Sequence, residues 1–184
     1  MKNVLDEGTR NIFLFEMAKQ REMYWGIKAI FPHMNKSIIG QSSVDTANYY
    51  KARGYFFKLV FLRPLTESDI ERNNEISRWM NENYVVRLYA LLNSYKIVFG
   101  LSSVDESIDG SKEVKLLIRL RNVFAHTSGK YNPEDERQRD LFKDIVAHFK
   151  SNEDESNEIR LDIDKVLDPL HEGCLRYVEG KFKK

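Results

Sequence analysis

Apolar side chains along this chain recur mostly at steps of three and four residues, which is the period of an amphipathic α-helix. Phe13, Met17, Tyr24, Ile27 and Phe31 follow this spacing. Pro32 comes next, and proline disfavours helical backbone in the residue before it. The pattern therefore predicts a first helix that ends or kinks near residue 31.

Residues 44–62 continue the helical spacing with Ala47, Tyr50, Gly54 and Phe57, and predict a second helix. The end of this segment, residues 55–62, is rich in aromatic and β-branched side chains. Such a short run is equally compatible with a β-strand. The sequence leaves helix and strand open for these residues.

A third helix is predicted to begin at Thr66 and to continue to Gly100. Thr66 suits the N-cap position, and Glu67 and Asp69 place negative charge in the first turn, where it favours the helix dipole. The apolar stripe of this helix consists of Ile76, Met80, Tyr84, Leu88, Leu91, Leu92, Tyr95 and Phe99. Asn81 and Asn83 within it predict a kink or a break.

A polar loop over residues 101–111 leads to another helix, which Thr127-Ser128-Gly129 should end. Asn132 as N-cap and Pro133 at the first helical position then predict a further helix. The apolar side chains of that further helix are Leu141, Phe142, Ile145, Val146 and Phe149. These elements predict two helices joined by a short turn.

The last part of the chain begins with residues 151–158, which carry four carboxylates and no apolar side chain and predict a solvated linker. Residues 158–163 alternate and predict a short extended segment, after which Asp164 caps a last helix. That helix has Val166, Leu167, Leu170, Leu175 and Val178 as its apolar residues. The predicted fold is an all-α, single-domain helical bundle of five or six helices over residues 1–184.

Composition agrees with one globular domain, since 42% of the 184 residues are hydrophobic and 31% are charged. With 29 basic and 28 acidic side chains the net charge is +1, so any contact with nucleic acid has to be local. The single cysteine, Cys174, excludes an intramolecular disulfide, and no Cys and His spacing supports a zinc site. An acidic N-terminus without a long apolar run predicts a soluble, cytoplasmic protein that does not enter a membrane.

Arg121 is the residue that this pattern explains least. On a helical wheel at about 100° per residue it falls within the apolar arc, whereas Lys115, Arg119 and Asn122 fall on the polar arc. Uncompensated burial of a charge is costly, so Arg121 needs a buried carboxylate, a partner chain or a bound anion. His126, at the end of the same helix, is of the residue type whose ordinary pKa suits proton transfer near neutral pH.

The segment Arg121-Asn122-Val123-Phe124-Ala125-His126 resembles the motif of the HEPN family, the higher eukaryote and prokaryote nucleotide-binding domains. That motif is an arginine, four to six intervening residues and a histidine, commonly with a polar residue such as Asn after the arginine. The resemblance covers residues 111–149 by motif and the rest of the chain by helical architecture. It implies a small all-α fold, and it implies ribonuclease activity, which many members of the family have.

The resemblance also implies roles for the residues of the motif. Metal-independent RNA cleavage needs a base for the 2′-hydroxyl, an acid for the leaving oxygen and positive charge on the phosphate. His126 would act as base or acid, Arg121 would hold the phosphate, and Asn122 would orient them. In HEPN ribonucleases two motifs meet across a homodimer cleft, and no cofactor takes part.

Further residues around the motif are predicted to contact RNA, and some of the assignments have alternatives. Basic and aromatic side chains near the motif, Arg119, Lys115, Lys130 and Tyr131, are the predicted RNA contacts. A solvated helix surface is an equally good interpretation of the basic ones, and Tyr84 and Tyr89 are open between base stacking and the core.

Two alternatives concern the motif itself. Arg119, six intervening residues before His126 and nearly on the same helix face, is a second candidate for the phosphate clamp. The competing structural interpretation is that Arg121 forms a buried ion pair with a helix carboxylate.

Toxins of the family that are modified by a partner nucleotidyltransferase carry a tyrosine two residues after the histidine, and here that position is Ser128. This departure argues against that particular pairing. Asp164, Asp168, His171 and Glu172 have helical spacing that resembles a metal site. We interpret Asp164 as a helix cap and the other three as the solvated face of the last helix.

The sequence thus predicts a metal-independent endoribonuclease of HEPN type, a homodimer that acts on RNA in toxin–antitoxin or defence systems, with an antitoxin or regulatory protein as a further partner. Two alternatives stay open. One is an inactive module of the same fold that binds RNA, nucleotides or another protein. The other is an unrelated helical interaction protein in which the motif is coincidental.

Overall fold

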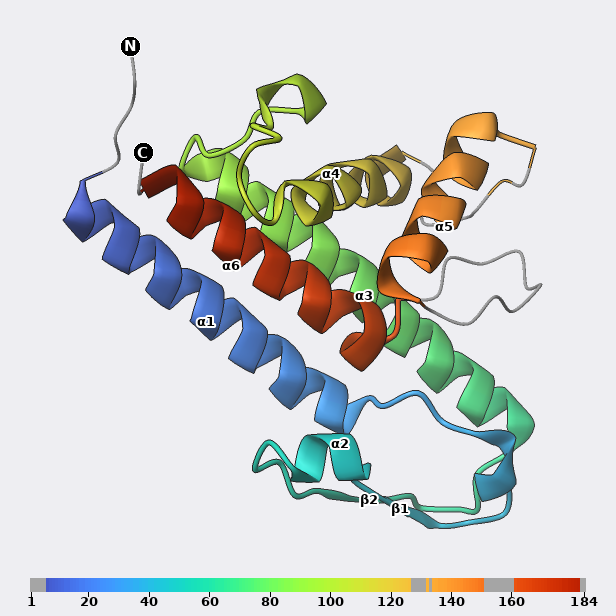
Figure 1. The fold of residues 1–184 in the computed structure, drawn as a ribbon. Coiled ribbons are helices and arrows are strands. Elements are labelled where there is room, and N and C mark those ends of the chain that lie inside the picture. Colours follow the sequence, from blue (N-terminus) through green and yellow to red (C-terminus); the bar gives the residue numbers. More distant parts are fainter. Residues whose placement is uncertain (1–5, 127–131, 133, 151–160, 183–184) are drawn as a thin grey trace. The chain divides into compact units, whose positions relative to one another are not determined.

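The computed structural model describes residues 6–126, 132, 134–150 and 161–182. Six α-helices, three short 3₁₀- or π-helical turns and one small antiparallel sheet account for the regular structure of these residues (Figure 1). The predicted all-α fold class is confirmed. None of the described helices combines the length and the apolar character that a membrane span requires.

The chain forms two compact units, one from residues 1–17 and 81–184 and the other from Ala18–Met80. Helix α1 (Glu7–Ile30) and helix α3 (Glu67–Ser94) each contribute residues to both units. The predicted first helix is confirmed, with Phe13, Met17 and Tyr24 buried, although Ile27 and Phe31 are exposed. The single domain over residues 1–184 stays a prediction.

The unit of residues 18–80 contains an antiparallel pair of strands where the sequence predicted a second helix. Strands β1 (Ser43–Asp45) and β2 (Lys58–Val60) pair with Val44 opposite Leu59, and the only helix between them is the short α2 (Asn48–Lys51). The Thr46 side chain closes the pair, since its Oγ1 accepts from Phe57 N at 2.6 Å and donates to Phe57 O at 2.7 Å. The helix predicted over residues 44–62 is therefore wrong. Within residues 55–62, which the sequence left open between helix and strand, residues 58–60 form a strand.

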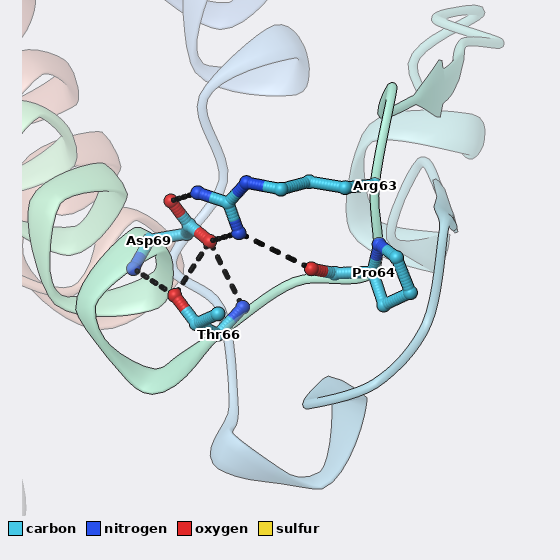
Figure 2. A network of polar contacts seen from close by, with 4 residues as sticks. All are labelled: Arg63, Pro64, Thr66 and Asp69. Carbon is cyan, nitrogen blue, oxygen red and sulfur yellow. Dashed lines mark hydrogen bonds and ion pairs between the residues drawn. The ribbon is translucent and has the colours of Figure 1, made fainter.

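The start of α3 agrees with the prediction, because Thr66 and Asp69 form a reciprocal cap (Figure 2). Thr66 N donates to Asp69 Oδ2 at 2.9 Å, and Asp69 N donates to Thr66 Oγ1 at 3.3 Å. Arg63 adds two parallel hydrogen bonds, to Asp69 Oδ2 at 2.7 Å and to Asp69 Oδ1 at 2.9 Å. The Arg63 guanidinium, together with Thr66, holds the pKa of Asp69 well below its usual range.

The other end of α3 differs from the prediction, which continued this helix to Gly100. The helix ends at Ser94, and Lys96 takes a left-handed conformation with φ 57°. Ile97 N then donates to Leu92 O at 2.9 Å, as in a helix C-terminal turn. The helix is continuous at Asn81, whose side-chain amide donates to Leu161 O at 2.9 Å.

The unit of residues 1–17 and 81–184 is built around α4 (Ser111–His126), which packs against α5 (Glu136–Phe149) and α6 (Asp168–Phe182). A π-helical turn, η3 (Ile163–Leu167), precedes α6, and a 3₁₀ turn, η2 (Leu101–Ser103), follows α3. The core of this unit is aliphatic and aromatic, with Leu88, Leu92, Val114, Leu117, Leu120, Leu167, Leu170 and Tyr177 fully buried. Burial of these faces supplies the main driving force for the packing of the helices.

Two glycines permit the close approach of α4 and α6. A Cβ atom on Gly110 would lie 1.9 Å from Gly173 O, and Gly110 has a φ of +84° that favours glycine. A Cβ atom on Gly173 would lie 2.3 Å from Glu113 Cγ. The backbone of α6 therefore contacts the first turn of α4 directly.

Two predicted helix starts in this unit are wrong. Helix α5 begins at Glu136 and is capped by Asp135, whose Oδ1 accepts from Arg137 N at 2.9 Å. Asn132, the predicted cap, instead accepts from Glu134 N at 3.0 Å in a turn that precedes the helix. The last helical segment begins after Asp162, whose backbone oxygen accepts from both Val166 N and Leu167 N.

Several predictions lie outside the described residues. They are the helix end at residues 127–129, Pro133 at the start of a helix, the linker at residues 151–158, and the first half of the extended segment at residues 158–163. In the described half of that segment, Leu161 and Asp162 belong to no strand and Ile163 begins η3.

Candidate functional site

Helix α4 carries the whole predicted motif in its last two turns. Its apolar face, which includes Leu117, Leu120 and Phe124, is buried in the unit. Arg121 is half-buried at one border of this face, whereas Asn122 and His126 are exposed. The amphipathic pattern therefore anchors the helix and leaves the polar residues of the motif at the surface.

The Arg121 guanidinium lies over the ring of Tyr89 in α3, with its central carbon 5.1 Å from the ring centroid. Arg121 Nη1 donates to Asn122 Oδ1 at 3.1 Å. A guanidinium over an aromatic face gains roughly 0.5–2 kcal/mol, depending on how far it is desolvated. No carboxylate among the described residues pairs with Arg121, so the alternative of a buried ion pair is not found in this part of the chain.

Arg119, the alternative clamp, does pair with a carboxylate. Its Nη1 contacts Asp144 Oδ2 on α5, and Lys115 contacts Glu106 in the same manner. Both ion pairs are exposed to solvent, and such pairs contribute little to the stability of the fold, commonly below about 1 kcal/mol. An RNA phosphate bound by either residue would compete with the carboxylate already present.

His126 is the last residue of α4, and its side chain makes no hydrogen bond or ion pair with another described residue. Five residues of an α-helix correspond to a rotation of roughly 140° from Arg121 when complete turns are subtracted. The structure accordingly gives no contact between Arg121 and His126 within the described chain. Lys130 and Tyr131, two of the predicted RNA contacts, lie outside the described residues.

The sequence around Arg121 and Tyr89 lacks acidic residues. Residues 83–104 and 114–133 contain no Asp or Glu, although the whole chain has 28 acidic residues. The contact between Tyr89 and Arg121 joins these two acid-free segments in space. Arg87 and Lys96 in the first segment are exposed, so the two segments together favour an anionic ligand.

An ionic network around the buried carboxylate of Glu113 in α4 was not predicted from the sequence. Glu113 Oε1 accepts from Arg176 Nη2 at 2.8 Å and lies 3.4 Å from His148 Nε2, and Arg176 Nε contacts Asp109 Oδ2 at 3.0 Å. These residues join α4 to α5 and α6. Glu113 precedes Leu117 and Leu120 by one and two helical turns, so its place on the buried face could have been found from the spacing.

The predicted solvated face of the last helix is wrong at one position. His171 is fully buried, and its Nδ1 shares a hydrogen bond with Tyr84 Oη at 2.6 Å. Tyr84 is therefore a core residue, while Tyr89 lies at the surface against Arg121. Among the residues that the structure describes, no group of three or more His, Cys, Asp or Glu side chains is arranged to hold a metal ion.

Comparison with known proteins gave no match to a family model, to a curated protein or to a solved structure.

Proposed function

We propose that this chain is a metal-independent endoribonuclease of HEPN type in which Arg121 and His126 act at the cleft of a homodimer. The observation that carries the proposal is the environment of Arg121. Tyr89 and Asn122 hold its guanidinium, whereas the nearby Arg119 and Lys115 are paired with carboxylates. A positioned cation without a carboxylate partner in the described chain supports a role in binding an anion.

The chemistry assigned to these residues uses the RNA itself as nucleophile. A histidine removes the proton of the 2′-hydroxyl, and the 2′-oxygen attacks the adjacent phosphorus. The bond from phosphorus to the 5′-oxygen then breaks, and a second side chain, acting as an acid, protonates that oxygen. The products are a 2′,3′-cyclic phosphate and a 5′-hydroxyl end, and Arg121 offsets the negative charge that grows on the phosphate.

This scheme needs a base and an acid at one phosphate, and a homodimer would supply two His126 side chains. The directions of Arg121 and His126 on α4 favour such a composite site, since they leave the helix about 140° apart. At a phosphate held by Arg121, the His126 side chain of one copy would then act as the base and that of the other copy as the acid. The biological role that we propose is that of a toxin or defence effector, with an antitoxin or regulatory protein as its partner.

The direct test is cleavage of single-stranded RNA by the purified chain in excess chelator. Arg121→Ala should lower the rate roughly 100- to 1,000-fold and His126→Ala roughly 100- to 10,000-fold. The melting temperature should be unchanged in His126→Ala and lowered by only about 2–8 °C in Arg121→Ala, which loses its contact with Tyr89. His33→Ala, which changes an exposed histidine of the other unit, is the matched control and should cleave normally. Cleavage that persists in His126→Ala would reject the assignment.

Two further measurements separate the alternatives. Loss of cleavage in Arg119→Ala with retention in Arg121→Ala would move the clamp to Arg119. An excess of His126→Ala subunits should inhibit the wild type beyond simple dilution if the site is shared between two copies. Wild-type protein that binds RNA and never cleaves it would identify a binding module instead.

A further inference from the structure

Phe99 is an aromatic side chain held in solvent by a well-connected turn. Its ring is 64% exposed, although Ile97 and Val98 just before it are buried. Ser103 Oγ accepts from Phe99 N at 2.8 Å and from Gly100 N at 3.2 Å, and it donates to Gly100 O at 2.6 Å. The backbone of Phe99 is therefore hydrogen-bonded to η2, and this fixed turn holds the apolar ring in solvent instead of in the core.

This turn is connected to Arg121 through a single side chain. Tyr89 Oη points to Phe99 O at 3.4 Å, a long hydrogen bond, while the face of the same tyrosine carries the Arg121 guanidinium. Phe99, Tyr89, Arg121 and Asn122 thus form one continuous chain of contacts. The hydroxyl of Tyr89 contacts the backbone of the exposed Phe99, and the ring of Tyr89 contacts the Arg121 guanidinium.

The occupant that fits this arrangement is a nucleotide with an unpaired base. Phe99 and Tyr89 belong to one acid-free segment and Arg121 to the other, so the surface favours a polyanion. In the proposed homodimer two copies of this surface would bring like charges together, and a bound polyanion would offset them. A single RNA strand supplies both an aromatic base and a phosphate with each nucleotide.

We propose that Phe99 is a base-stacking residue, which stacks an unpaired nucleobase while Arg121 holds a neighbouring phosphate. The inference rests on the proposed function in that its ligand is RNA, but it does not require that the RNA be cleaved. A base inside a duplex has both faces covered by its neighbours and cannot stack on Phe99. The site therefore selects single-stranded over double-stranded RNA.

The test is a binding measurement with a probe that cannot be cleaved. A short single-stranded 2′-O-methyl RNA with 2-aminopurine in place of adenine has no 2′-hydroxyl proton, and its fluorescence falls when the base stacks. Phe99→Ala should weaken binding roughly 5- to 150-fold, the range for loss of one base stack, and should abolish the quenching. Phe99→Trp should restore both.

Leu101→Ala is the matched control, since Leu101 is 44% exposed in the same turn but has no ring to stack. It should bind the probe like the wild type. Equal binding by Phe99→Ala and wild type would overturn the inference, and so would a wild type that does not bind the probe. A change of Phe99→Ala from dimer to monomer in light scattering would overturn it in favour of an interface between copies.

The same experiment distinguishes this inference from the proposed function. If Phe99→Ala loses affinity but the wild type never cleaves unmodified RNA, base stacking stands and the ribonuclease proposal fails. If the wild type cleaves and Phe99→Ala binds normally, the ribonuclease proposal stands and base stacking fails.

Discussion

Lys28 is a buried amine whose ionisation should be visible in the stability of the protein. Its side chain is 2% exposed, and Nζ donates to Ser77 O at 3.0 Å and also contacts Ser77 Oγ. Burial lowers the pKa of Lys28 from 10.5 to about 8. This difference means that the charged amine costs the folded state about 3 kcal/mol relative to the unfolded chain.

The direction of the pH effect follows from proton uptake on unfolding. Between pH 8 and 10.5 the unfolded chain keeps a proton on Lys28 that the folded chain has released. The free energy of unfolding should therefore rise with pH in this window, by at most about 1.4 kcal/mol per pH unit from this group. Below the window both states are protonated and the cost is fully present, and above it the cost disappears.

Urea denaturation of wild type and Lys28→Met at a series of pH values measures this contribution. From neutral pH to above pH 10.5 the wild type should gain about 3 kcal/mol relative to Lys28→Met, because methionine does not titrate. The change with pH is diagnostic, since the difference at neutral pH also contains the cost of the Ser77 groups left without the amine. Lys19→Met, an exposed lysine of the same helix, should parallel the wild type. Parallel curves for Lys28→Met and wild type would refute the reasoning.

Three other predictions follow from the packing and the caps. Gly173→Ala should lower the free energy of unfolding by about 1–3 kcal/mol in calorimetry, because the added Cβ would lie 2.3 Å from Glu113 Cγ. Gly100→Ala is the control and should not lower it, since its Cβ would meet nothing within 4 Å. A Gly173→Ala variant as stable as the wild type would contradict the close contact between the helices. Tyr84→Phe should lower the free energy of unfolding by about 1–3 kcal/mol in urea denaturation, because it removes a buried hydrogen bond to His171 of α6. If the variant is as stable as the wild type, this hydrogen bond contributes nothing to stability. Asp69→Asn should lower the melting temperature at neutral pH. It should also flatten the loss of stability as pH falls below 3.8, because a carboxyl with a lowered pKa stabilises the fold only while ionised; equal slopes in acid would argue against the network in Figure 2.

The parts of the fold that sequence predicted well depend on neighbours in the chain. The first helix and the cap of α3 follow from spacing and from Thr66 and Asp69, which interact across three residues. The strands β1 and β2 depend on Thr46 meeting Phe57, eleven residues away, so their apolar spacing alone suggested a helix. Asp135 caps α5 because Asn132, the residue that the local pattern prefers as a cap, is used in the turn before it. Asp164, the other predicted cap, lies inside the π-helical turn that begins after Asp162.

For the candidate site, the sequence by itself determined that Arg121 and His126 share the end of one amphipathic helix and that the arginine needs a partner. It did so because helical periodicity and the cost of burying a charge are both local properties. Only the tertiary structure decided which partner each arginine has. Arg121 lies on Tyr89 of α3 and Arg119 pairs with Asp144 of α5, because these contacts join residues that are distant in the chain and meet only when the helices pack. Whether an apolar side chain is covered also depends on this packing, which leaves Phe99 exposed.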